Sequence, residues 1–310
     1  MKNKILEKLK KEKNYISGQQ LCDELGVSRT AVWKNIKTLK EEGYIIDSVN
    51  NKGYRLLETP DSIDEISISS ELTTKWLGKS MAYYDETDST NNRIKALGEE
   101  GKSEGYLAVA ERQNAGKGRR GRAWVSDKGV GIWMSFLLRP TIEPSKVSMI
   151  TIVAAMAVAK GIERTTGLDC KIKWPNDIVV NGKKVCGILT ELSSEVDYVN
   201  YAVVGIGINA NMDSFPMEIA ETATSLSIEL GHKVKRNEII VEVLKQFETY
   251  YAQFLAEGNL KKLSEEYNRL LISKDKEVII LENDKEYIRK SLGIDELGRL
   301  IVENDKGEVN

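Results

Sequence analysis

The chain is poor in the residue types that most often carry enzyme chemistry. Its 310 residues include one histidine and three cysteines. A single histidine, His232, excludes histidine-rich metal sites and argues against Ser-His-Asp catalysis; because it follows a glycine, we expect it in a solvated loop. The cysteines Cys22, Cys170 and Cys186 lie far apart without a C-x-x-C pair. This spacing predicts reduced, unpaired thiols in a cytoplasmic protein, not a disulfide or a zinc site.

Long apolar runs are also missing. The longest, around residues 150–159, is about half as long as a membrane span needs. The Met-Lys-Asn-Lys start leads into a charged segment, so nothing predicts an export signal. A hydrophobic content of 41% is enough for a full core and for more than one domain.

Net charge is close to zero, but the charge is unevenly distributed. Residues 1–57 carry 12 Lys+Arg against 7 Asp+Glu, whereas the remainder carries 33 against 40. A basic head on an acidic body predicts that a polyanionic partner, if there is one, docks at the front of the chain.

The basic segment has the pattern of a winged helix-turn-helix. Ser17 and Gln20 form a capping box for one helix, which Gly26 ends. Ser28 starts the next helix, which we expect to run to about Glu42. The runs "YIIDSV" and "YRLLE" then predict a hairpin, which would be the wing. Cations and hydroxyls near the start of the second helix are the candidate DNA-binding residues: Ser28, Arg29, Thr30, Lys34 and Lys37.

An alternative for the same segment is a three-helix bundle that merely packs on the rest of the chain, with solvated lysines. The agreement of capping, turn, charge asymmetry and wing favours DNA binding. After it, Pro60 and the polar stretch "ETPDSIDEIS" predict a linker, so residues 1–60 are expected to form a separate domain.

The stretch "GKGRRGRAW", residues 116–124, spells G-x-G-x-x-G, the dinucleotide-binding fingerprint. That fingerprint requires a helix to open at the glycines, because the pyrophosphate sits on the helix N-terminus. Downstream, "RAWVSDKGVGIWMSFLLRP" has no helical repeat and predicts a loop followed by a strand over residues 131–138. A P-loop is excluded as well, because Gly121 is not followed by Lys-Ser/Thr.

What remains is a cationic loop between two strands. Lys117, Arg119, Arg120 and Arg122 can pair with carboxylate or phosphate oxygens, and the glycines let the backbone approach a ligand closely. Charge-assisted hydrogen bonds return roughly 1.5–3 kcal/mol each, whereas fixing the backbone costs roughly 1–2 kcal/mol per residue. We therefore expect a loop that is mobile when empty and ordered by a multiply charged ligand. A solvated basic surface loop is the alternative.

Two neighbouring segments strengthen the ligand interpretation. "DETDSTNNRIKAL" clusters short polar side chains at a predicted helix start over residues 90–98, suited to an uncharged polar ligand; a simple N-cap is the alternative. "KIKWPNDIVVNGKKVCGILTEL" predicts a strand, a proline corner and a hairpin that turns at Asn181-Gly182. Lys184 follows on the returning strand, where it could point into a site or be solvated.

The predicted fold is α+β. Helical patterns over residues 147–165 and 237–271 and the intervening strands predict a mixed sheet with helices on one side, over residues 61–271. Residues 272–310 predict short strands with turns at Asn283-Asp284 and at glycines. A segment of this size is too small to fold stably by itself, so we expect it to form a small SH3-like barrel that packs on the middle domain.

Taken together, the glycine-rich basic loop, the D-S-T-N helix start, the K-W-P-N-D corner and the later "GIGINAN" strand resemble the biotin protein ligase family. With a winged helix in front, the chain resembles the bifunctional bacterial form, the biotin operon repressor. The resemblance implies an ATP- and Mg²⁺-dependent ligase that forms biotinyl-5′-AMP and transfers biotin to a lysine of a biotin carboxyl carrier domain. It also implies operator DNA as a partner, biotinyl-5′-AMP as corepressor and a ligand-promoted homodimer.

The same resemblance assigns roles to individual positions. The implied biotin-binding residues are Ser89, Thr90, Asn91, Gln113, Lys117, Gly118, Arg119, Lys184 and Gly187. The implied adenylate-binding residues are Arg119, Arg120, Arg122, Trp124, Asn176, Asp177 and Asn209. Trp174 falls with the last three of them where the family builds the adenylate pocket and the acceptor approach. Lys184 and Arg119 are the implied catalytic residues. Lys117 stands where relatives commonly have arginine, which keeps the charge but loses the planar fork.

Two other functions stay open from the sequence. A lipoate-type protein ligase would share the catalytic architecture, although the winged helix and the K-W-P-N-D corner speak against it. A ligand-sensing regulator would form the adenylate without transferring it to a carrier domain.

Overall fold

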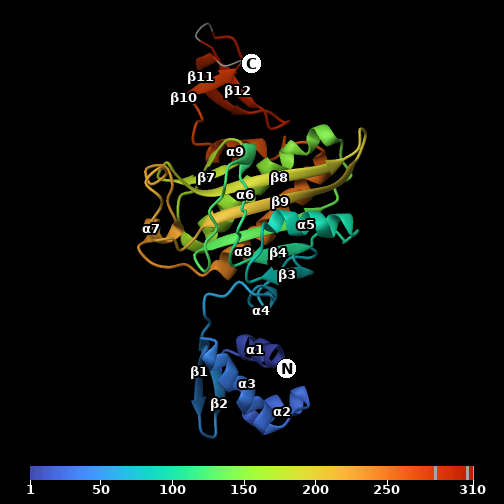
Figure 1. Ribbon diagram of the computed structural model, residues 1–310, viewed down its shortest axis with the longest axis vertical. Coiled ribbons are helices and arrows are strands. Elements are labelled where there is room, and N and C mark those ends of the chain that lie inside the picture. The colour runs from blue at the N-terminus through green and yellow to red at the C-terminus, as the bar shows by residue number, and fades with distance from the viewer. Residues whose placement is uncertain (283–284, 305–306, 310) are drawn as a thin grey trace. The chain divides into compact units, whose positions relative to one another are not determined.

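The computed structural model describes residues 1–282, 285–304 and 307–309. The chain divides into two compact units, Met1–Glu71 and Leu72–Asn310 (Figure 1). The first unit extends past the predicted domain boundary at residue 60. The division into three domains stays a prediction, and each of the two units is described by itself below.

The first unit is a helix-turn-helix followed by a two-stranded hairpin, as the sequence predicted. Ser17 Oγ accepts the Gln20 N–H at 3.0 Å, and Gly26 ends the helix with φ +65°, where glycine is favoured. The second half of the predicted capping box is wrong, because the Gln20 side chain donates to Glu24 at 2.9 Å and does not reach back. The elements are α1 (Lys2–Lys11), α2 (Gly18–Leu25), α3 (Arg29–Glu41), β1 (Ile45–Val49), β2 (Gly53–Glu58) and α4 (Glu65–Ser69).

Part of the stretch expected to be a linker is folded as helix α4. Asp64 caps it by accepting the Ser67 N–H at 2.8 Å. Ile66 packs against the hydrophobic core of the first unit, and Lys10 of α1 donates to Ser70 at 2.7 Å. These contacts explain why the first unit continues to Glu71.

A seven-stranded mixed sheet is the centre of the second unit, with strand order β3-β4-β5-β9-β8-β7-β6. β3 and β4 pair in parallel, whereas the remaining neighbours pair antiparallel. The strands are β3 (Met81–Tyr84), β4 (Leu107–Ala110), β5 (Gly131–Leu138), β6 (Lys171–Lys173), β7 (Asp177–Val180), β8 (Lys183–Ser194) and β9 (Val199–Asn209). The strand predicted over residues 131–138 is confirmed.

Two long helices pack together: α6 (Ser148–Thr166) and α8 (Arg236–Glu257). Helix α8 also covers one face of the sheet, where the ring centroids of Phe136 and Phe247 lie 4.6 Å apart. Helix α5 (Thr90–Glu99) departs from the expectation of helices on one side (Figure 1). Its Ile94 packs with Leu137, which points away from Phe136 because side chains alternate along a strand.

Residues 144–166, which include α6, are the one described segment whose helix is long and apolar enough to cross a membrane. In this fold 72% of that apolar stretch is buried inside the protein, so α6 is a core helix.

The long helical pattern over residues 237–271 forms two helices. Gly258, with φ +68°, ends α8 in the left-handed region and α9 (Ser264–Leu270) follows. The C-terminal residues form β10 (Glu277–Glu282), β11 (Lys285–Ile294) and β12 (Leu300–Glu303). Where a small barrel was expected, the described residues form a three-stranded antiparallel sheet. The predicted Asn283-Asp284 turn lies outside the described residues. The remaining short helices are η1 (Arg119–Gly121), η2 (Pro144–Lys146) and α7 (Leu226–Leu230).

Candidate ligand pocket and DNA-binding surface

A cavity of about 770 Å³ opens on the face of the sheet that carries α5. The structure brings to this one cavity all but one of the residues expected to contact biotin or the adenylate in the sequence predictions, although their individual roles stay predictions. These lining residues are Ser89, Thr90, Asn91, Gln113, Lys117, Gly118, Arg119, Arg120, Arg122, Trp124, Asn176, Asp177, Lys184, Gly187 and Asn209. Trp174 lies outside the lining, and its indole N–H donates to the Gly298 carbonyl at 3.0 Å.

Strand glycines make the room for this cavity. A Cβ on Gly205 of β9 would lie 2.0 Å from Asn91 Oδ1, and one on Gly207 would lie 2.6 Å from Trp124 Nε1. On the neighbouring strand β8, a Cβ on Gly187 would lie 2.9 Å from the Trp124 ring. Sequence reasoning missed Gly205 and Gly207, although their alternate spacing in "GIGIN" places both on one face of a strand.

One end of the pocket is polar and uncharged. Ser89 occupies the N-cap position of α5, yet its side chain makes no capping hydrogen bond and is only 3% exposed. The carbonyl oxygen of the Gln113 side chain instead accepts the Thr90 N–H at 2.8 Å. The simple N-cap alternative therefore does not describe this helix start, and the Ser89 hydroxyl is not engaged in capping.

Asp88, just before this helix, carries a negative charge at the positive end of the helix dipole. Burial would raise its pKa, but hydrogen bonds from Asn92, from the Ser89 N–H and from Thr87 outweigh burial and lower the pKa to about 2. Arg93 adds an ion pair at 3.1 Å. An ionised carboxylate here stabilises the first turn, on which the polar end is built.

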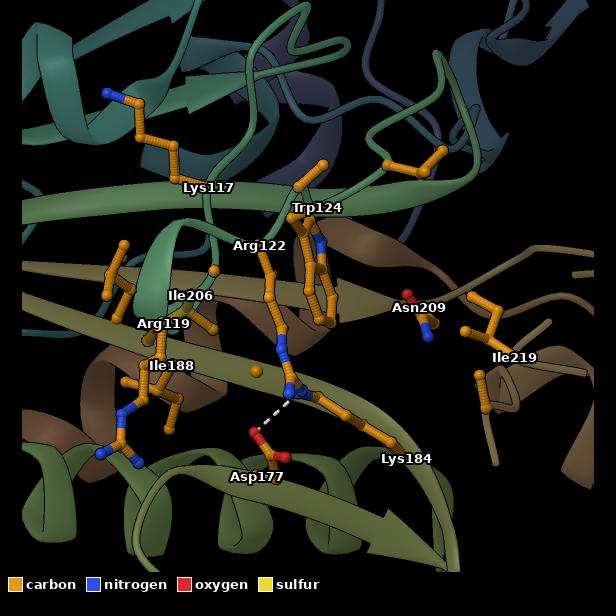
Figure 2. Close-up of a pocket in the computed structure, with 18 of the residues that line it drawn as sticks. Lys117, Arg119, Arg122, Trp124, Asp177, Lys184, Ile188, Ile206, Asn209 and Ile219 are labelled. Carbon is orange, nitrogen blue, oxygen red and sulfur yellow. Dashed lines mark ion pairs between the residues drawn. The ribbon is translucent and has the colours of Figure 1, made fainter. Parts of the chain in front are cut away.

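The cationic loop forms a small hairpin beside the pocket. Gly118 N–H donates to the Arg122 carbonyl at 2.7 Å, and Trp124 N–H donates to the Gly116 carbonyl at 2.9 Å. Arg119, an exposed residue, makes one side-chain hydrogen bond, from Nη1 to Asn176 Oδ1 at 2.8 Å. In Figure 2, Arg122 extends in the direction of Lys184 and Asp177. The arrangement leaves most of the positive charge on this loop available to an anion.

Lys184 is held in the pocket and is not a solvated hairpin lysine. Its Nζ lies 2.7 Å from Asp177 Oδ1 (Figure 2) and 5.1 Å from the centroid of the Trp124 ring system. The Lys184 backbone also bonds to Thr222 and Thr224 at 2.8 and 2.9 Å. A cation on a rigid strand, beside a carboxylate and an aromatic face, is well placed to meet ligand oxygens.

Sequence reasoning missed one wall of the cavity. It is formed by the irregular segment after β9, for which no periodic pattern gives a signal. Its lining residues are Met212, Ser214, Phe215, Pro216, Ile219, Thr222 and Ala223. Asn209, at the end of β9, ties this wall to the sheet by donating to the Thr224 carbonyl at 3.1 Å.

The candidate DNA-binding residues lie together in the first unit. Ser28 precedes α3, and Arg29, Thr30, Lys34 and Lys37 follow along the helix; all five are exposed. The Ser28 hydroxyl accepts the Ala31 N–H at 3.2 Å, so it caps the helix. Trp33, between them, is 54% exposed. An exposed helix start with cations and hydroxyls is the arrangement by which a recognition helix meets DNA.

Comparisons with known proteins agree with this architecture. Residues 83–209 match the biotin/lipoate A/B protein ligase family, and residues 2–55 match a helix-turn-helix domain. The chain is 42% identical to the bifunctional ligase/repressor BirA of Bacillus subtilis, over 94% of this chain and 90% of that protein. It is 31% identical to the bifunctional ligase/repressor BirA of Escherichia coli, over 93% and 88%. The solved structure of the Aquifex aeolicus biotin protein ligase in complex with biotin and ATP is similar, with a TM-score of 0.65 and 32% identity over 75% of this chain and 94% of that one.

Proposed function

Because this chain belongs to the family of bifunctional biotin ligase/repressors, we propose that its pocket joins biotin to AMP and passes biotin to a carrier protein. The family relationship makes the chain a biotin–protein ligase with a DNA-binding repressor domain. The observation that carries the residue-level proposal is one cavity with an uncharged polar end and a cationic end. Biotin has the matching ends, a ureido ring and a carboxylate.

In the first step, a carboxylate oxygen of biotin attacks the α-phosphorus of ATP, and pyrophosphate leaves. The difficulty of this step is to bring two anions together while charge grows on the phosphate. Lys184 and the loop arginines Arg119 and Arg122 supply positive charge at that end of the pocket. Fixed cations of this kind position the reactants and stabilise the transition state.

In the second step, the amine of a lysine on a biotin carboxyl carrier domain attacks the acyl carbon of biotinyl-5′-AMP, and AMP leaves. No side-chain nucleophile is needed, which suits a chain whose one histidine, His232, is exposed. Mg²⁺ enters as part of the nucleotide substrate, bound to triphosphate oxygens. For this reason we assign it no protein ligand.

The regulatory role uses the same ligand. Biotinyl-5′-AMP neutralises the loop over residues 116–122 and orders it, and the ordered form dimerises and binds operator DNA in the cytoplasm through α3. The loop is then the two-state element that couples ligand binding to DNA binding. Its exposed cations and its single side-chain bond to Asn176 support this view.

A biotin-dependent ATP–pyrophosphate exchange assay tests the ligase proposal. We expect exchange with biotin and none with lipoate, followed by labelling of a carrier domain with biotin. Exchange supported by lipoate alone would assign the lipoate-type activity. Adenylate formation without transfer to any carrier domain would leave only the ligand-sensing regulator.

Gel shifts and hydrogen exchange test the regulatory proposal. Operator affinity should rise when biotin and ATP are both present, and the backbone amides of residues 116–122 should gain protection under the same conditions. Equal DNA affinity with and without the ligands would remove the repressor role. A loop that is already protected in the empty protein would remove the coupling mechanism.

A further inference from the structure

A chain of hydrogen bonds runs behind the polar end of the pocket. Asn91 Nδ2 donates to Glu191 at 2.7 Å, and Ser135 Oγ donates to Asn91 Oδ1 at 2.6 Å. The Ser135 and Thr90 hydroxyls lie 2.6 Å apart. Ser135 on β5 is fully buried, and neither it nor Glu191 on β8 is among the residues that line the cavity.

Glu191 fixes the direction of every bond in this chain. A carboxylate can only accept, so the Asn91 amide must turn its NH₂ toward Glu191 and its oxygen toward Ser135. The single hydroxyl proton of Ser135 then goes to Asn91. As a result, Ser135 can serve Thr90 only as an acceptor, and the Thr90 hydroxyl proton points inward.

The consequence appears at the pocket surface. With its proton turned inward, the Thr90 hydroxyl presents lone pairs to a ligand. The Gln113 side-chain oxygen receives the Thr90 backbone N–H at 2.8 Å and also lies 3.0 Å from the Thr90 hydroxyl, so it is a second acceptor for the hydroxyl proton. Whether Ser135 or Gln113 accepts it, this proton is used within the protein. The polar end is therefore set to accept a hydrogen bond from a ligand N–H.

Glu191 holds the charge that this ordering requires. Burial raises its pKa, but hydrogen bonds from Lys95 and Asn91 outweigh burial and keep the pKa below the ordinary value for glutamate. Lys95 of α5 forms an ion pair with it. The carboxylate is thus ionised at neutral pH.

We propose that Glu191 and Ser135 are positioning residues that give the pocket its preference for a ring N–H donor. This inference rests on the proposed function, in which the donor is the ureido N–H of biotin. The two residues touch no substrate; they act through Asn91 and Thr90. The pocket thereby distinguishes biotin from acids of similar length without such a donor, such as lipoate.

The variants Ser135→Ala and Glu191→Gln test the proposal in the full-length protein. Biotin affinity is measured by calorimetry without nucleotide, and the KM for ATP by pyrophosphate exchange. Ser135→Ala should weaken biotin binding about tenfold, the loss of one buried hydrogen bond, with the KM for ATP unchanged. Glu191→Gln should weaken biotin less, about threefold, because an amide no longer imposes one direction but can still accept.

Thr190→Val is the matched control. It removes a hydroxyl–hydroxyl bond of 2.8 Å to Thr151, one residue from Glu191 on the opposite side of β8, and should leave biotin affinity unchanged. Wild-type protein that binds no biotin would overturn the proposed function. Wild-type binding with unchanged affinity in both variants would overturn only this inference. Equal losses of affinity for biotin and ATP, or an equal loss of biotin affinity in Thr190→Val, would show a merely structural role and would also overturn the inference. If Ser135→Ala does not fold, the test rests on Glu191→Gln, because Glu191 is partly exposed.

Discussion

The two ends of the pocket differ in how their side chains are held. At the polar end, Ser89, Thr90 and Asn91 are each no more than 5% exposed, and Thr90 and Asn91 are fixed by hydrogen bonds. On the cationic loop, Lys117 and Arg119 are exposed, and Arg119 makes one side-chain hydrogen bond, to Asn176. One end is held by hydrogen bonds within the protein, whereas we propose that the cations of the other end are fixed by the charge of the ligand.

This difference has a physical basis in entropy. A preorganised site has already met the cost of ordering its side chains, so binding there is favourable for a weakly interacting, neutral group. In a loop of like charges, the entropy cost of fixing the side chains is offset only when charge-assisted hydrogen bonds form to phosphate or carboxylate oxygens. The comparison predicts that changes at the two ends affect different measurements.

The largest effect is expected from Lys184→Ala. Removing a fixed cation at the reacting phosphate should lower the rate of biotin-dependent pyrophosphate exchange about 10²- to 10³-fold, while biotin binding without nucleotide changes little. The control is Lys183→Ala, the neighbouring lysine, which is exposed and lies outside the lining. A normal exchange rate in Lys184→Ala would separate the cationic end from the chemistry.

Arg119→Ala should act on retention of the intermediate. We expect biotinyl-5′-AMP to dissociate about 10- to 100-fold faster, which corresponds to one charge-assisted hydrogen bond, with the melting temperature unchanged because Arg119 is exposed. Arg112→Ala is the control, since this arginine pairs with Glu86 at 3.5 Å and does not line the pocket. Release of the adenylate at the wild-type rate would show that Arg119 does not help the cationic loop to hold the intermediate.

The sequence predicted most of the fold wherever the signal is local. The caps at Ser17 and Ser28, the strand at residues 131–138 and the Asn181-Gly182 turn all rest on neighbours a few residues apart, and the structure has each of them. Gly258 carried the signal to split the last helical pattern. Helix α4 could not be expected from a short polar stretch, because its stability comes from packing of Ile66 on a distant core.

In the candidate site, too, the residues with a local sequence signal could be predicted and those that depend on long-range contacts could not. Its loop, helix start and proline corner are each contiguous in sequence, so these segments could be recognised in advance, and the family resemblance supplied the roles of their residues. Ser135 and Glu191 could not, since their role depends on which strands lie next to each other and in what register. Ser135 on β5 faces Gly205 on β9, whose missing side chain leaves the space that Asn91 fills. No pattern along one strand contains that information.

The smallest effect, and the one that most sharpens the comparison, is expected from Lys117→Arg. Lys117 belongs to the cationic loop, yet in Figure 2 it extends away from Lys184 and Asp177. Its charge also helps to lower the pKa of Glu191, which burial alone would raise. Lys117 should therefore act with the polar end of the pocket.

An arginine at this position restores a planar fork that can make two parallel hydrogen bonds. We expect biotin to bind about threefold more tightly, the gain from one additional net hydrogen bond, with the KM for ATP unchanged. The comparison variant is Arg120→Lys, which makes the reverse exchange on the same loop and should leave biotin affinity in the absence of nucleotide as it is. If Lys117→Arg changes only the KM for ATP, residue 117 belongs with the phosphate-binding cations. The whole cationic loop would then act with the phosphate-binding end of the pocket, and the division between the two ends would lie before residue 117.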